Sequence, residues 1–176
     1  EIYTLSLHDA LPILAYALGA FPGTWRDDYK IIDEEYKEGI YVGYRWTDKQ
    51  KVRPLFAFGH GLSYTTFKLG KPTLNSPTSF TVSVTNTGNM AGSETIQLYI
   101  SDKHASVDRP VKELKAFQKV FLQPGETRDV TLTIGREALS FYDEASHQWK
   151  VEPGKFEALI GTASDQIAGK CVFELK

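Results

Sequence analysis

Apolar and polar residues alternate in several short runs after residue 72. The alternating apolar positions are Phe80, Val82 and Val84; Ile96, Leu98 and Ile100; Val130, Leu132 and Ile134; and Phe156, Ala158 and Ile160. A period of two places every second side chain on one face, which predicts half-buried strands. The runs are separated by turn-forming segments at Asn86–Asn89 and Gln123–Glu126.

The remaining runs complete an all-β pattern. Leu139–Tyr142 and Trp149–Val151 flank a polar turn and predict a hairpin, while Val111–Leu122 has room for one or two strands. Cys171, Phe173 and Leu175 end the chain on one face. This makes about seven short strands without a convincing helix, which is typical of an antiparallel immunoglobulin or fibronectin type III-like β-sandwich. We expect this domain at 72–176.

Residues 21–71 have a different pattern, rich in glycine, proline and aromatic residues. Asp33–Glu38 has the composition of a helical turn, and Gly39–Trp46 is β-prone. Pro54–Thr66 has glycines on both sides of His60, which predicts an irregular turn. This region cannot build a core alone, so we interpret 21–71 as the closing segment of a larger domain plus a linker.

The first twenty residues are a doubtful segment. The chain starts at Glu1, and Leu5–Ile13 resembles the translation of a sequencing adapter, so we expect 1–20 to mark a truncation or an assembly artefact. Leu11–Ala20 is a short apolar run, but no lysine or arginine precedes it as a signal peptide requires.

Composition narrows the function classes. The 176 residues carry a net charge of −2, which excludes a strongly basic nucleic-acid binder and gives no electrostatic reason to bind a membrane surface. No apolar run reaches the length of a membrane helix. Cys171 is the single cysteine, so no internal disulfide or cysteine metal cluster is expected.

Catalytic chemistry is hard to find in the residues. The acidic pairs Asp27/Asp28, Glu34/Glu35 and Asp143/Glu144 are adjacent in sequence, so their side chains point apart and suit solvated loops. The histidines are His8, His60, His104 and His147, scattered without metal-ligand or nucleophile spacing. We therefore predict no catalytic, metal-binding or cofactor-binding residue and no cofactor.

Three side chains leave alternatives open. His60 lies either at a pocket rim or in a turn that bonds its backbone, and we favour the turn. Arg45, between Tyr44 and Trp46, suits a domain interface better than a ligand contact. Trp149 is either a platform for a sugar ring or a half-buried tryptophan of the sandwich, and we favour the second.

Two long motifs resemble glycoside hydrolase family 3. Glu38–Arg45 followed by Pro54–Tyr64 is similar to the stretch before that family's C-terminal domain, with Ala57 where proline is frequent. Further segments resemble its fibronectin type III-like domain: Val84–Gly88, Gln97–Ser101, Arg109–Phe117, Leu122–Arg128, Leu139–Asp143 and Glu152–Phe156. The resemblance implies that 21–71 is the end of an α/β sandwich domain.

The resemblance also implies what the chain lacks. Family members are typically β-glucosidases, β-xylosidases or related exo-acting retaining enzymes. They have an aspartate nucleophile in an N-terminal barrel and a carboxylate acid/base that usually comes from the next domain. The sequence contains neither the motif of the nucleophile nor that of the acid/base. We expect an accessory part that braces the missing N-terminal catalytic domains, is inactive alone, and contacts them through the connecting segment Phe56–Phe67. Periplasmic or secreted location is implied by resemblance only. The alternative is a carbohydrate-binding or adhesive β-sandwich.

Overall fold

The computed structural model describes residues 39–176. The chain divides into two compact units, with the boundary between Phe58 and Gly59. In the first unit, helix α3 (Tyr44–Gln50) follows a turn at Gly43, whose carbonyl accepts hydrogen bonds from the Trp46 and Thr47 amides. No described helix is long and apolar enough to cross a membrane.

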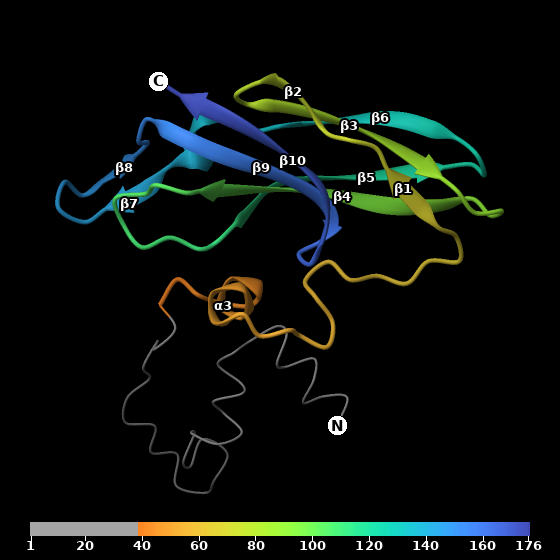
Figure 1. The fold of residues 1–176 in the computed structure, drawn as a ribbon, viewed down its shortest axis with the longest axis horizontal. Helices are drawn as coiled ribbons and strands as arrows, with labels where there is room; N and C mark the ends of the chain where they lie inside the picture. The colour runs from red at the N-terminus through yellow and green to blue at the C-terminus, as the bar shows by residue number, and fades with distance from the viewer. Residues whose placement is uncertain (1–38) are drawn as a thin grey trace, which may run out of the picture. The chain divides into compact units, whose positions relative to one another are not determined.

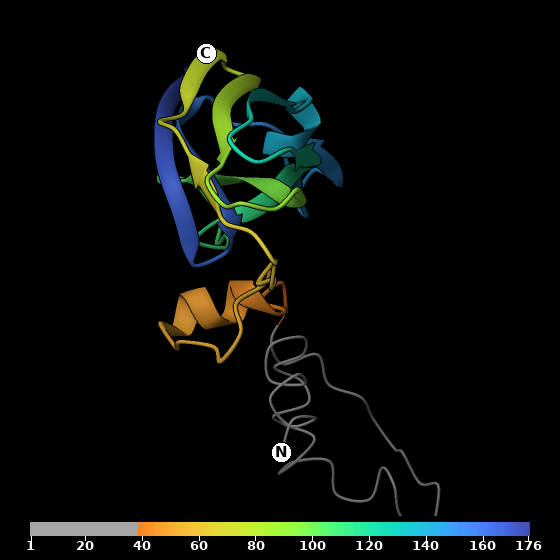
Figure 2. The ribbon, with the colours of Figure 1, turned by 90° about the vertical axis from the view of Figure 1, so that its right-hand side faces the viewer.

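The second unit is an antiparallel β-sandwich (Figures 1 and 2). Its elements are β1 (Phe67–Leu69), β2 (Thr73–Ser76), β3 (Ser79–Asn86), β4 (Gly92–Asp102), β5 (Glu113–Leu122), β6 (Thr127–Thr133), the 3-10 helix η1 (Arg136–Leu139), β7 (Phe141–Asp143), β8 (Gln148–Lys150), β9 (Gly154–Ala163) and β10 (Gln166–Leu175). In one sheet β3 pairs with β1, β2 and β6. The other sheet has the order β10-β9-β4-β5, and β7 and β8 form a separate hairpin.

The core lies between the two sheets. The alternating residues of β3, β4, β6 and β9 supply it, and the rings of Phe80 and Phe156 each lie 5.5 Å from the ring of Phe173. Burying a large apolar side chain contributes about 1.5–3 kcal/mol, so these positions stabilise the sandwich most. The predicted all-β fold, its alternating strands and the Leu139–Val151 hairpin are confirmed.

Two sequence expectations differ from the structure. The β-prone interpretation of Gly39–Trp46 is wrong, because Tyr44 begins α3 and the amide bonds to Gly43 outweigh the aromatic preference for strands. The sandwich begins at Phe67, ahead of residue 72, because β1 pairs with β3. The helical turn expected at Asp33–Glu38 and the doubtful segment 1–20 lie outside the described residues.

Asn86 joins three segments at the end of the sandwich. Its fully buried side-chain amide donates to the carbonyls of Met90 and Leu122, at 2.7 and 3.1 Å. Its side-chain oxygen accepts from the Thr65 hydroxyl at 2.7 Å and from the Gly88 amide at 3.1 Å. One side-chain amide thereby bonds polar groups of the segment before β1 and of the turn between β3 and β4.

We predict that Asn86→Ala lowers the free energy of unfolding by about 3 kcal/mol, because it leaves buried carbonyls without donors. Urea unfolding of the full chain followed by circular dichroism measures the change. Asn75→Ala is the matched control, since Asn75 is exposed and bonds the exposed hydroxyl of Thr81. Equal losses in the two variants would contradict the role of Asn86.

Candidate functional site

Strand β4 is buried on both faces, which is unusual for a sheet that covers a single core. Ile96, Leu98 and Ile100 face the core, and Gln97, Tyr99 and Ser101, on the opposite face, are also buried. Since alternating residues of a strand point to opposite faces, something must cover the outer face of β4. Two segments of the sandwich unit do so.

The first cover is the loop 103–112, which follows β4 and folds back over it. The Ser101 hydroxyl donates to the carbonyl of Val111 at 2.6 Å. The buried Lys112 ammonium lies 5.8 Å from the centre of the Tyr99 ring, within reach of a cation–π attraction. The loop therefore satisfies polar groups of β4 and shields an aromatic ring from water.

The second cover is the segment Gly59–Ser63. Gly59 has φ +86° and lies so close to Gln97 that a Cβ atom there would collide with the side-chain amide. That amide is itself fixed, because it donates to the carbonyl of Thr162 at 2.7 Å and accepts from the Tyr99 hydroxyl. Glycine is required at this position for both its φ and the close approach.

A cavity of about 320 Å³ lies between this segment and the sheet. It is lined by Gly59–Ser63, Ser93–Thr95, Lys119, Thr162, Ala163 and Gln166. Exposed apolar side chains stand around it. Leu62 and Tyr64 are 95% and 94% exposed, and Phe117 and Phe121 are exposed on the edge strand β5, where Phe121 pairs with the cavity residue Ser93.

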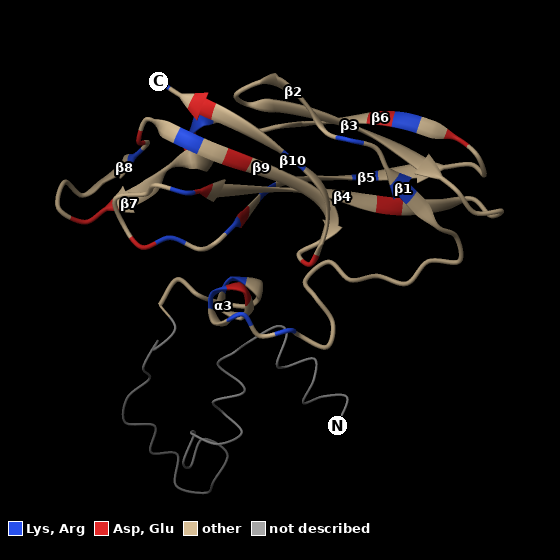
Figure 3. Cartoon of the chain, viewed as in Figure 1, with Lys and Arg blue, Asp and Glu red and all other residues tan. Residues whose placement is uncertain are grey.

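We call Leu62, Tyr64, Phe117 and Phe121 with this cavity the docking surface. Single exposed apolar residues are ordinary, but large ones gathered around one cavity mark an interaction site. In the first unit, Phe56 and Phe58 of the connecting segment are also exposed. Charges of both signs are interspersed over the described strands (Figure 3). The docking surface is therefore distinguished by its exposed apolar side chains and not by charge of one sign.

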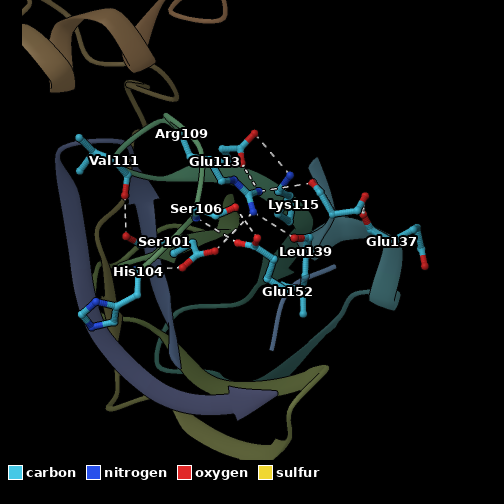
Figure 4. Close-up of polar contacts among 12 residues, drawn as sticks. Ser101, His104, Ser106, Arg109, Val111, Glu113, Lys115, Glu137, Leu139 and Glu152 are labelled. Atoms are coloured by element: carbon cyan, nitrogen blue, oxygen red, sulfur yellow. Dashed lines mark hydrogen bonds and ion pairs between the residues drawn. The ribbon is translucent and has the colours of Figure 1, made fainter. Parts of the chain in front are cut away.

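A polar cluster separate from the docking surface is centred on Arg109 in the loop 103–112 (Figure 4). Its guanidinium lies 2.8 Å from the Glu113 carboxylate and 3.6 Å from that of Asp102, and its side chain is only 9% exposed. It also donates to the carbonyls of Leu139 and Ser140 at 3.1 and 3.4 Å. Arg109 therefore ties the loop to the segment that leads into β7.

Ser106 ties the same loop to the other end of the hairpin. The Glu152 carboxylate, just after β8, accepts from the Ser106 amide at 3.1 Å and from the Ser106 hydroxyl. These bonds favour the charged carboxylate, and the hydroxyl contributes most to lowering the pKa of Glu152 below its ordinary value. Arg109 and Ser106 together hold both ends of the β7–β8 hairpin.

The structure places the predicted candidates apart. Asp143 accepts from the Ser146 hydroxyl at 2.7 Å and from the Ala145 amide at 3.3 Å, so it orders a turn and the hydroxyl lowers its pKa. His60 lines the cavity, while His104 and His147 lie in other exposed turns. Residues 39–176 contain no group of three possible metal ligands. Asp27/Asp28, Glu34/Glu35 and His8 lie outside the described residues.

The interpretation of Trp149 as half-buried is wrong. Its side chain is 72% exposed, because β8 belongs to the separate hairpin and has no second sheet above it. Sequence reasoning also missed Arg109 and Gln97 as organising residues. The Arg109-Pro110 pair stood in a recognised motif, but no local pattern shows that an arginine will bond carbonyls thirty residues away.

We predict that Gly59→Ala lowers the free energy of unfolding of the sandwich by about 2 kcal/mol, because of its positive φ and the collision with Gln97. Gly61→Ala is the matched control, since a Cβ there meets nothing within 4 Å. Chemical unfolding followed by circular dichroism measures both. Unchanged stability of Gly59→Ala would show that the segment does not pack on β4.

We predict that Ser106→Ala raises the pKa of Glu152 toward its ordinary value, as measured by carboxyl NMR titration. A lowered pKa stabilises the fold above the unfolded-state pKa, and the gain disappears as the pH falls through the folded-state pKa. The stability difference between variant and wild type should thus shrink on acidification. Ser106→Thr, which keeps the hydroxyl, should behave like wild type, and an unchanged Glu152 pKa in Ser106→Ala refutes the link.

Comparisons with known proteins agree with this architecture. The family model described as "Fibronectin type III-like domain" matches residues 94–164. The Bacteroides ovatus protein "Beta-glucosidase BoGH3A" is 53% identical over 81% of this chain and 20% of its own length. "Thermostable beta-glucosidase B" of Acetivibrio thermocellus is 46% identical over 85% of this chain and 20% of its length.

Solved structures give the same result. The β-glucosidase DesR of Streptomyces venezuelae, crystallised with D-glucose, superposes with a TM-score of 0.78 and 38% identity over 84% of this chain and 20% of that chain. The family 3 β-glucosidase of Bifidobacterium adolescentis superposes with a TM-score of 0.76 and 36% identity, over 82% and 23%.

The chain spans about a fifth of the length of the curated relatives that it matches. The resemblance carried by the two sequence motifs is confirmed by these relatives and by the fold. The chain thus contains a fibronectin type III-like domain and is similar to the C-terminal region of glycoside hydrolase family 3 β-glucosidases.

Proposed function

We propose that this chain is the accessory, domain-bracing part of a family 3 exo-acting β-glycosidase, of β-glucosidase type. The observation that carries the proposal is the match to only a fifth of each β-glucosidase relative, together with an apolar docking surface on the matched domain. The partner of that surface is the catalytic part of the same enzyme. By itself the chain hydrolyses no glycoside.

The docking surface supports this role through its composition. Leu62 and Tyr64 are almost fully exposed to water, which is unfavourable for large apolar side chains. A partner that covers them would therefore gain binding free energy. Phe117 and Phe121 extend the apolar area along β5. Aromatic side chains around a concave centre are typical of the residues that contribute most to protein–protein binding.

The rigid base of this surface supports bracing rather than loose tethering. Gly59 rests on Gln97, whose amide is bonded to Thr162 and Tyr99. A partner that binds Leu62 and Tyr64 therefore binds a segment already held on β4, and little conformational freedom is lost on association. The described fold supports assigning the part of 21–71 up to Phe58 to the end of the preceding α/β domain, because it forms a separate unit and the sandwich core contains no described residue before Phe67.

The proposal is tested by adding the chain to a relative that lacks the matching part. We use the Bacteroides ovatus β-glucosidase with its C-terminal fifth removed, and the removed fragment serves as positive control. We expect this chain to bind the truncated enzyme and to raise its thermal stability and its hydrolysis of an aryl β-glucoside. The chain alone should release no aglycone.

Double substitution Leu62→Ser and Tyr64→Ser should weaken binding at least about tenfold, or about 1.4 kcal/mol, because the partner loses two apolar contacts. Leu74→Ser is the control, since Leu74 is exposed on β2 in the other sheet. Restoration by the relative's own fragment but none by this chain would refute the proposal, as would equal weakening by Leu74→Ser.

A further inference from the structure

The β7–β8 hairpin presents two exposed aromatic rings to solvent. Tyr142 and Trp149 are directly opposite each other in the hairpin, with ring centres 5.8 Å apart and planes at 73°. This edge-to-face arrangement is a favourable one for aromatic pairs. Tyr142 is 48% exposed and Trp149 72% exposed, so both rings keep much of their surface in contact with solvent.

The hairpin is held more firmly than its small size suggests. A two-stranded hairpin is marginally stable by itself. Here Arg109 bonds the carbonyls of Leu139 and Ser140 before β7, and Ser106 bonds Glu152 after β8 (Figure 4). At the tip, Asp143 accepts from Ser146 and Ala145. The Trp149 ring is therefore mounted on a support fixed at both ends and at its turn.

The surroundings of Trp149 differ from those of the docking surface. The neighbouring exposed residues of the hairpin are polar or charged: Glu144, Ser146, His147, Gln148 and Lys150. A protein interface of ordinary size needs about 800 Å² from each partner with an apolar centre, and one ring pair among charges does not supply it. A flat, exposed apolar ring on an otherwise polar hairpin instead matches a ligand that is apolar on its faces and polar at its edge.

We propose that Trp149, packed against Tyr142, is a binding site for a carbohydrate of β-linked glucose units. In β-glucopyranose the hydroxyls are equatorial, so each face of the ring presents only C–H groups. One such face stacks on the indole, while the hydroxyls at the rim of the sugar stay in contact with water. The ligand class follows from the aromatic and polar pattern, and the match to β-glucosidases is consistent with it.

This site is separate from the proposed bracing role. It involves β7 and β8, whereas the docking surface involves the segment before β1 and strand β5. A stacking site on the accessory domain would hold a glucan chain near the enzyme and raise its local concentration. Because the two surfaces share no residue, either proposal stands or fails without the other.

The test is an NMR titration of the full chain with cellotetraose, following the indole N–H signal of Trp149 and the Tyr142 ring. We expect saturable shifts with a millimolar Kd, as suits one stacking contact. Trp149→Ala should weaken binding at least about tenfold, and Trp149→Phe, which keeps a flat ring, should lose less. Phe117→Ala is the matched control, since Phe117 is similarly exposed on β5.

Three results would overturn the proposal. One is the absence of shifts in wild type at about 20 mM cellotetraose, well above a millimolar Kd. Another is equal weakening by Phe117→Ala and Trp149→Ala. The third is loss of binding to the truncated β-glucosidase in Trp149→Ala without any binding of cellotetraose, which would make the hairpin a protein contact.

Discussion

The burial of strand β4 on both faces is the constraint on which the rest of the structure depends. Ile96, Leu98 and Ile100 pack in the core, and the polar side chains of the opposite face cannot be buried without partners. Gln97 finds them in Thr162 and Tyr99, and Ser101 finds one in Val111. The bond of Ser101 fixes the loop 103–112 over the outer face of the sheet, and the bonds of Gln97 fix the amide on which Gly59 rests.

These two segments carry the surfaces that we interpret as functional. The Gly59–Ser63 segment lies on Gln97 and presents Leu62 beside the cavity. The loop 103–112 lies over Tyr99 and supplies Arg109 and Ser106, which hold the hairpin of Trp149. Removing Arg109 would take away the cation that the carboxylates of Asp102 and Glu113 share, so the loop geometry is strongly specified. Packing of one central strand thus positions both surfaces.

Sequence reasoning predicted the sandwich because its signals are local. Alternation in Phe80–Val84 or Val130–Ile134 needs only neighbouring residues to be recognised, and the structure confirms it. The exposure of Trp149 was missed because it depends on the absence of a second sheet above β8, which no local pattern encodes. The outer cover of β4 was missed for the same reason, since it joins residues far apart in sequence, such as Gly59 and Gln97.

Recognition of the family came from motifs, but the roles of their residues came from contacts. The connecting segment Phe56–Phe67 was expected to contact a partner domain, and the exposure of Leu62 and Tyr64 gives that expectation a physical basis. No sequence pattern separates an apolar residue that packs inward from one that awaits a partner. Only the burial of each side chain in the folded domain makes that distinction.

The central claim is that the sandwich binds a catalytic partner through Leu62, Tyr64 and β5. Hydrogen–deuterium exchange of the chain, free and with the truncated Bacteroides ovatus β-glucosidase, tests it most directly. The account predicts slower amide exchange in Gly59–Tyr64 and along Phe117–Phe121, with β2 unchanged. Unchanged exchange in both segments, or protection confined to β2 and β3, would contradict it.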